Sequence, residues 1–313
     1  MRNPFTTPVQ DAGELLIGPL RAPRQMLATQ QYDNHTSIHD DTTAQQLGFK
    51  GGTIEGPTHF SQFAPLGFAL WGQRWFETGC LSAHYRNPCF EGEQVRAFMA
   101  KPKDNTSHTA IWMQREDGTE ILRGTASVGS SNPPSALEQR IAQLDAPEKL
   151  VILRDVRLGM RTGRVRVTMD ASRNMGALYP FSLTDKLRVI TENSSWYSDA
   201  GSPWGRAIIP MEMISVLLNH SREGTQLPVR GPVVGLFADQ EIRLLKGPLF
   251  VAEPYEISRE VVALSGSRRT ESMWVLTSVF APGSETLLAT MLLNSASLKD
   301  SYANYAQELA ALA

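Results

Sequence analysis

The sequence predicts an α+β protein made of two fused copies of one unit, each a helix packed against an antiparallel sheet. The first observation behind this prediction is a repeated turn. Residues 87–93 read NPCFEGE and residues 247–253 read GPLFVAE, so that Pro, Phe and Glu recur at the same spacing 160 residues apart. Internal similarity at a fixed separation indicates duplication of a structural unit.

Two further pairs of segments keep the same order along the chain. Residues 110–128 can be laid over 272–293, with Trp112 on Trp274 and GTEIL on GSETL. Upstream of both turns, residues 51–70 match residues 205–221 in position and pattern. Three matches in one order are best explained by duplication, and each half then contains one helix followed by several strands.

The helix of each half is predicted to be buried. In the first half Gly56 is followed by Pro57, which suits the first position of a helix because its missing N–H has no partner there. Residues 57–72 are apolar on nearly all faces, which is typical of a helix enclosed by other structure. Pro65 is expected to kink or shorten this helix. Residues 210–221 are expected to form the corresponding helix of the second half.

The strands are recognised by alternation of apolar and polar residues. Residues 94–100 and 107–115 have apolar side chains at every second position, and Asp117-Gly118 is a strong hairpin turn. A buried helix wrapped by an antiparallel meander is the hotdog arrangement. The sequence therefore predicts a double hotdog in which two helix-wrapped sheets join into one continuous sheet, with an N-terminal unit over 1–135 and a C-terminal unit over 136–313.

Composition excludes several classes of function. The formal net charge is -2, so no basic field favours nucleic acid. No run of about 18 apolar residues is present, and the N-terminus lacks the pattern of a signal peptide, so we expect a cytoplasmic protein with no membrane contact. Cys80 and Cys89 do not have metal-site spacing and are expected to be buried free thiols. No metal and no bound cofactor is expected.

One stretch of the first half resembles a known family. It contains Ile38-His39-Asp40-Asp41, then Gly48-Phe49, then Ile54-Glu55-Gly56. This order resembles the signature of the MaoC-like (R)-specific enoyl-CoA hydratases and dehydratases, and NPCFEGE resembles the turn between two strands of that family. The resemblance covers roughly residues 30–130. It implies the double-hotdog form and a lyase that hydrates an enoyl thioester or dehydrates a β-hydroxyacyl thioester, with a small-molecule acyl thioester, most simply of coenzyme A, as partner.

The resemblance also implies the site residues. His39 takes the place of the family's catalytic histidine, and Asn34 stands where the family carries its catalytic Asp. Glu55 stands where the family usually has His, and is the first choice among nearby carboxylates that could replace the missing Asp. These three are the predicted catalytic residues. Gly56, Thr58 and His59, at the start of the buried helix, are the predicted substrate-binding residues, since a helix start offers amides to an enolate-like oxygen.

Other interpretations stay open on the sequence alone. His39 can be a hydrogen-bonded structural residue, and Glu55 can merely complement the helix dipole. The protein can be a thioesterase or another elimination enzyme, or a non-catalytic acyl-CoA-binding or scaffold protein. Phe63, Trp71 or Trp75 plugging the cavity would favour a non-catalytic role. The second half lacks a matching His and is expected to wall a substrate tunnel. Because the fused pair already joins two sheets, a homodimer is optional.

Overall fold

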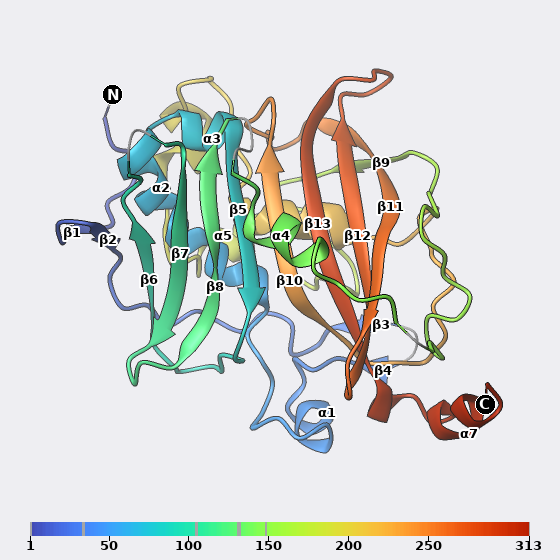
Figure 1. Ribbon diagram of the computed structural model, residues 1–313. Helices are drawn as coiled ribbons and strands as arrows, with labels where there is room; N and C mark the ends of the chain where they lie inside the picture. The colour runs from blue at the N-terminus through green and yellow to red at the C-terminus, as the bar shows by residue number, and fades with distance from the viewer. Residues whose placement is uncertain (1, 33–34, 104–105, 130–132, 148, 313) are drawn as a thin grey trace.

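The fold is organised around one continuous sheet of 11 strands, shown in Figure 1. The structure is a computed structural model that describes residues 2–32, 35–103, 106–129, 133–147 and 149–312. The strand order is β1-β2-β6-β7-β8-β5-β10-β13-β12-β11-β9, and every neighbouring pair is antiparallel. A separate pair of short strands precedes the first helix. The strands of the first half are β1 (Gln10–Asp11), β2 (Leu15–Ile17), β3 (Gln31–Tyr32), β4 (His35–Thr36), β5 (Gly79–Tyr85), β6 (Val95–Ala100), β7 (His108–Arg115) and β8 (Glu120–Val128).

The second half repeats the strand order of the first. Its strands are β9 (Val165–Thr168), β10 (Gly235–Leu244), β11 (Pro254–Gly266), β12 (Thr270–Phe280) and β13 (Leu287–Leu298). The order β5-β8-β7-β6-β2 in the first half corresponds to β10-β13-β12-β11-β9 in the second. Trp112 and Trp274 lie on the corresponding strands β7 and β12, as the repeat predicted. The structure thus confirms the α+β double hotdog with one continuous sheet.

The repeated turn has the same structural role in both halves. Phe90 forms an isolated antiparallel bridge with Thr53, and Phe250 forms one with Ile208. Beside these bridges, the Ile54 amide donates to the Cys89 carbonyl at 2.7 Å, and the Ile209 amide donates to the Leu249 carbonyl at 2.8 Å. The turn therefore holds the segment that enters the central helix.

The central helix of the first half changes type along its length. A 3-10 helix, η1 (Gly56–Phe63), runs into the α-helix α2 (Ala64–Trp71). The expected helix over 57–72 is present but is not a single α-helix. Pro65 explains the difference, because it has no N–H to donate to the Ser61 carbonyl, which accepts instead from Ala64 in the tighter pattern. The second central helix, α6 (Met211–Asn219), is regular and packs against η1.

The remaining helices lie around the sheet. The helix α4 (Ala136–Ile141) crosses the sheet where the halves meet, on the face opposite the central helices (Figure 1), and its Leu137 packs against Trp274. Because α4 contacts β5 and β8 as well as β10, the predicted boundary between residues 135 and 136 stays a prediction. The other helices are α1 (Asp41–Gln46), α3 (Arg74–Thr78), α5 (Leu183–Leu187), η2 (Ser195–Tyr197), η3 (Asp199–Gly201), η4 (Lys299–Ser301) and α7 (Tyr305–Ala310).

Two expectations from composition concern the cysteines and the membrane. Cys80 and Cys89 are both free and buried, as expected, and burial raises the pKa of the Cys89 thiol to about 12. Over the described ranges, no helix has the length and apolar character needed to cross a membrane.

The two halves join where β5 pairs with β10, and a buried carboxylate lies at this junction. Asp239 on β10 is fully buried, and its two oxygens receive hydrogen bonds from His84 on β5 and from Asn294 on β13, both at 2.8 Å. The Arg140 guanidinium of α4 also lies 2.8 Å from it. One side chain thus links three segments of the junction.

We expect Asp239→Ala to lower the free energy of unfolding by about 1–3 kcal/mol, because it leaves buried donors without their acceptor. Urea denaturation followed by circular dichroism measures this. Asp155→Ala is the matched control, since Asp155 pairs with Arg230 while its side chain is 47% exposed. The control is expected to cost under about 1 kcal/mol. Equal losses in the two variants would contradict a special role for the junction carboxylate.

Candidate active site

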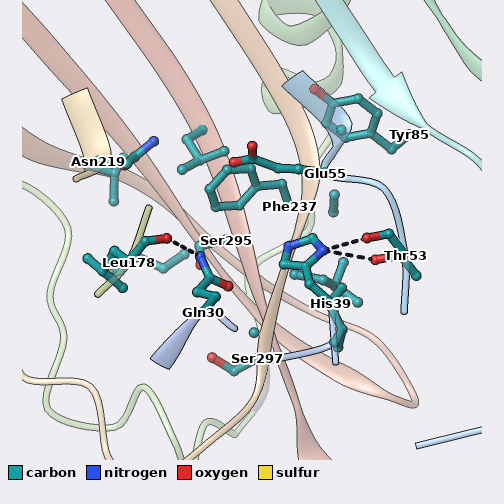
Figure 2. A pocket seen from close by; sticks show the side chains of 18 of the residues that line it. Gln30, His39, Thr53, Glu55, Tyr85, Leu178, Asn219, Phe237, Ser295 and Ser297 are labelled. Atoms are coloured by element: carbon teal, nitrogen blue, oxygen red, sulfur yellow. Dashed lines mark hydrogen bonds between the residues drawn. The ribbon is translucent and has the colours of Figure 1, made fainter. Parts of the chain in front are cut away.

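The candidate site is a cavity of about 700 Å³ that both halves of the protein line. The first half contributes the segment that enters η1, including His39, Glu55 and Gly56. The second half contributes strands β10, β12 and β13, including Phe237 and Leu293. Cavities of roughly 300–1,000 Å³ are typical of sites for small molecules. Figure 2 shows His39 and Glu55 of the first half and Phe237 and Ser295 of the second half around the pocket.

Strands of the second half form one wall of the cavity. Alternate side chains of a strand point to the same face of the sheet, and this period brings a mixed set of apolar and hydroxyl groups to the cavity. They are Met273, Val275 and Thr277 of β12 and Leu293, Ser295 and Ser297 of β13. The expectation that the second half walls the site agrees with this arrangement.

The three aromatic residues that could plug the cavity do not line it. Phe63 and Trp75 are fully buried in the hydrophobic core, and Trp71 stacks on Trp75 with ring centroids 5.6 Å apart. The cavity is therefore open to a ligand at the residues that surround His39.

His39 is held as a neutral imidazole of defined tautomer. Its Nδ1 lies 2.6 Å from the carbonyl oxygen of Thr53, and because a carbonyl only accepts, Nδ1 carries the hydrogen. Nε2 consequently keeps its lone pair. Burial lowers the pKa of His39 to about 4, against a smaller opposing effect of the Thr53 carbonyl. At neutral pH this histidine is therefore uncharged, with Nε2 unprotonated.

The acidic residues that follow His39 position the backbone. Asp40 is the N-cap of α1 and accepts from the amide of Thr43 at 2.8 Å. Asp41 accepts from the amide of Gly52 at 2.7 Å and so ties α1 to the segment that enters η1. Asp40 and Asp41 therefore hold the backbone that positions His39 against Thr53.

Glu55 is a buried carboxyl at the start of η1 with a raised pKa. Its side chain is not engaged in capping the helix, and the residue is 8% exposed. The hydroxyl of Tyr179, from the second half, donates to Oε1 at 3.0 Å. Burial raises the pKa of Glu55 to about 7, against the opposing effects of the nearby Lys186 charge and of the Tyr179 hydrogen bond. Glu55 stands two positions after the bridged residue Thr53. In the second half the bridged residue is Ile208, so Pro210 occupies the equivalent position.

Gly56 provides an amide at the edge of the cavity. Over the described part of the chain its N–H has no hydrogen-bond partner, as expected for the first residue of a helix. A Cβ at this position would lie 2.5 Å from the ring of Tyr85, so only glycine fits. Tyr85 in turn donates its hydroxyl to Gln240 of β10 at 3.0 Å. Closeness to Tyr85 thus explains the glycine, and the free amide is an available donor.

The other predicted site residues lie as follows. His59 lines the cavity, and burial together with the Lys186 charge lowers its pKa to about 3. Thr58 does not line the cavity, and its hydroxyl accepts from Lys186 at 3.1 Å, so its role in binding substrate stays a prediction. Asn34 lies outside the described residues.

Sequence reasoning missed the residues that reach the site from elsewhere in the fold. Tyr179 bonds to a carboxyl 124 positions away, and Lys186 lies beside residues of η1 although it belongs to α5. Neither has a local motif that signals a site. Tyr85 follows a strand pattern, in which an aromatic residue is ordinary.

No family model matches the sequence, and no curated protein is significantly similar to it. Solved structures are similar in fold. A protein from Chloroflexus aurantiacus J-10-fl assigned as a MaoC domain dehydratase aligns with a TM-score of 0.55 and 13% identity, over 92% of this chain and 96% of that one. A conserved hypothetical protein from Mycobacterium tuberculosis with a double hotdog fold aligns with a TM-score of 0.51 and 12% identity, over 93% and 96%. At this identity the similarities show the double hotdog fold.

We expect the free energy of unfolding of the Glu55→Gln variant to increase relative to that of the wild type as pH rises. In the wild type the folded state keeps the Glu55 proton up to pH about 7, whereas the unfolded chain loses it near 4.5, so Glu55 lowers stability progressively between these values. Gln cannot ionise and avoids this loss. The variant should therefore gain up to about 3 kcal/mol over the wild type between pH 4.5 and pH 8 in urea denaturation.

Glu285→Gln is the control for this measurement, because the Glu285 side chain is 90% exposed. Its stability relative to the wild type should not change between the two pH values. A pH-independent difference for Glu55→Gln would show that Glu55 ionises normally.

Proposed function

We propose that this protein is a hydro-lyase that hydrates an enoyl thioester or dehydrates a β-hydroxyacyl thioester. The observation that carries the proposal is His39, a neutral imidazole whose Nε2 is unprotonated and whose ring lines a cavity shared with Glu55 and Gly56. A base, a carboxyl with a pKa near neutrality and a free helix-start amide are the groups that addition of water to a conjugated thioester requires.

The proposed reaction uses one water molecule. The water donates one hydrogen bond to Nε2 of His39 and one to the ionised carboxylate of Glu55. Its oxygen attacks the β-carbon while its proton moves to Nε2, and the electron pair of the double bond moves toward the thioester carbonyl. The Gly56 amide donates to the enolate-like oxygen. His39 then returns the proton to the α-carbon, which restores the neutral imidazole and leaves a β-hydroxyacyl thioester.

Tyr179 and Lys186 support Glu55 in this scheme. Both act against the effect of burial and favour the ionised carboxylate. The hydrogen bond of Tyr179 occupies Oε1 and leaves Oε2 for the water. The second half thereby supplies a group that holds the proposed catalytic carboxylate, although it has no histidine at the site.

The proposed carrier is coenzyme A, which the resemblance to the MaoC-like family implies. A thioesterase is the alternative on the same residues: the water held by His39 would attack the thioester carbon instead of the β-carbon and release a free thiol. The two reactions give different products, so one assay with two readouts separates them.

We expect His39→Ala to lower kcat by about 10²–10⁴-fold, the usual effect of removing a positioned proton-transfer group. The assay follows loss of the conjugated-thioester absorbance over a panel of enoyl-CoAs, with release of free thiol measured in parallel. His108→Ala is the control, since His108 lies on β7 and does not line the cavity. Full turnover by His39→Ala would refute the site, and release of free thiol that accounts for all of the absorbance loss would favour a thioesterase.

We expect kcat/KM to fall as pH falls below about 7, because the water needs Glu55 ionised while His39 stays neutral down to about pH 4. Glu55→Gln should lower the rate and flatten the profile over pH 5–8. A limb near pH 7 that persists in this variant would assign the titration to another group.

A further inference from the structure

Besides Glu55, the cavity is lined by four arginines, Arg86, Arg222, Arg230 and Arg259. Arg259 on β11 lines it and is 7% exposed. The guanidinium donates to the carbonyls of Leu218 at 2.6 Å and Ser221 at 3.2 Å, and to the hydroxyl of Thr225. All of these acceptors are neutral. Within the described residues, no carboxylate lies within ion-pair distance of it.

Arg243 provides a comparison, because it is also 7% exposed. Its guanidinium lies 2.8 Å from Glu241 and 3.2 Å from Glu138. Buried charges are normally paired in this way. Arg259 instead has a like charge, Arg222, as its neighbour, and burial and Arg222 together lower its pKa to about 10. Arg259 is therefore still charged at neutral pH, and among the described residues its guanidinium donates to the carbonyls of Leu218, Ser221 and Thr225 and to the Thr225 hydroxyl.

Arg259 belongs to a polar end of the cavity, away from the proposed catalytic residues. It caps the end of α6, and Asn219 at that end also lines the cavity. Figure 2 places Asn219 and His39 on opposite sides of the pocket, with Phe237 between them. Thr277, paired with Arg259 across β11 and β12, lines the cavity too. Gln30 and Ser295 also lie between the two sides, so apolar and polar side chains together line the stretch that separates the ends of the cavity.

We propose that Arg259 binds a carboxylate at the far end of the acyl chain, so that the substrates are thioesters of dicarboxylic acids. The inference rests on the proposed function, which places the thioester near Gly56 and His39. A chain that starts there and passes Phe237 would bring its other end to Arg259. Because Nη1 and Nη2 of Arg259 already donate to Thr225, Leu218 and Ser221, the carboxylate accepts from Nε and brings a negative charge beside the guanidinium. Asn219 and Thr277 can add neutral donors.

The phosphates of coenzyme A are the other source of an anion for this site. They are less suited to it, because Arg259 is enclosed by β11, β12 and the end of α6, and a doubly charged, strongly hydrated group would have to be desolvated to reach it. Thioesters of pantetheine carry no phosphate and so separate the two sources.

The experiment measures binding of two saturated thioesters by calorimetry. Glutaryl-pantetheine and pentanoyl-pantetheine have the same chain length, differ in the terminal carboxylate and cannot be hydrated. We expect the wild type to bind the glutaryl compound about 10- to 100-fold more tightly, the range for a hydrogen bond to a charged group. Arg259→Gln should abolish this ratio. Arg243→Gln should keep it, even if that variant is less stable.

Three results would overturn the proposal. They are equal or weaker binding of the glutaryl compound by the wild type, a preference that survives in Arg259→Gln, and a loss of affinity for free coenzyme A in Arg259→Gln with no preference between the two thioesters. The last would assign Arg259 to the carrier. If Arg259→Gln fails to fold, Arg259→Lys replaces it and should keep a reduced preference. Failure of the hydration assay with the binding preference intact would refute the proposed reaction and leave this site standing.

Discussion

The antiparallel pairing of β5 with β10 is the constraint on which the site depends. Its register sets Ala83 opposite Gln240, and the next residue of β5, His84, opposite Asp239. Tyr85, the last residue of β5, covers Gly56 with its ring while its hydroxyl binds Gln240. The start of η1 therefore packs against a residue that the other half of the protein holds in place.

Buried charge is the second link between the halves. Lys186 lies 3.7 Å from Glu212 of α6 and donates to Thr58 of η1, and its charge also acts on Glu55. Two carboxyls thus share one ammonium group in an apolar surrounding, and burial raises the pKa of both to about 7. Burial therefore opposes ionisation of both carboxyls near neutral pH, and the Lys186 charge favours it.

Features that depend on residues close together in the sequence could be predicted, and contacts between distant segments could not. The duplicated turn predicted the repeated strand order, because Phe90 and Phe250 each bridge the segment that enters the central helix of their own half. His39 was recognisable because the motif that contains it, from Ile38 to Gly56, lies within one short stretch of the sequence. Tyr179 and Arg259 meet the site through tertiary packing, which no local pattern encodes. The 3-10 geometry of η1 was missed because periodicity alone does not separate it from an α-helix, although Pro65 signalled a break.

The replacement of Glu55 by Pro210 at the equivalent point of the second half has a consequence for how such sites diversify. A symmetric dimer of identical single hotdogs must carry each side chain twice, so an arginine introduced for one end of a ligand also appears in the second site. A fused chain is free of this restriction. Each half can acquire residues that would be harmful if doubled, and one cavity can then combine a carboxyl from one half with a cation from the other.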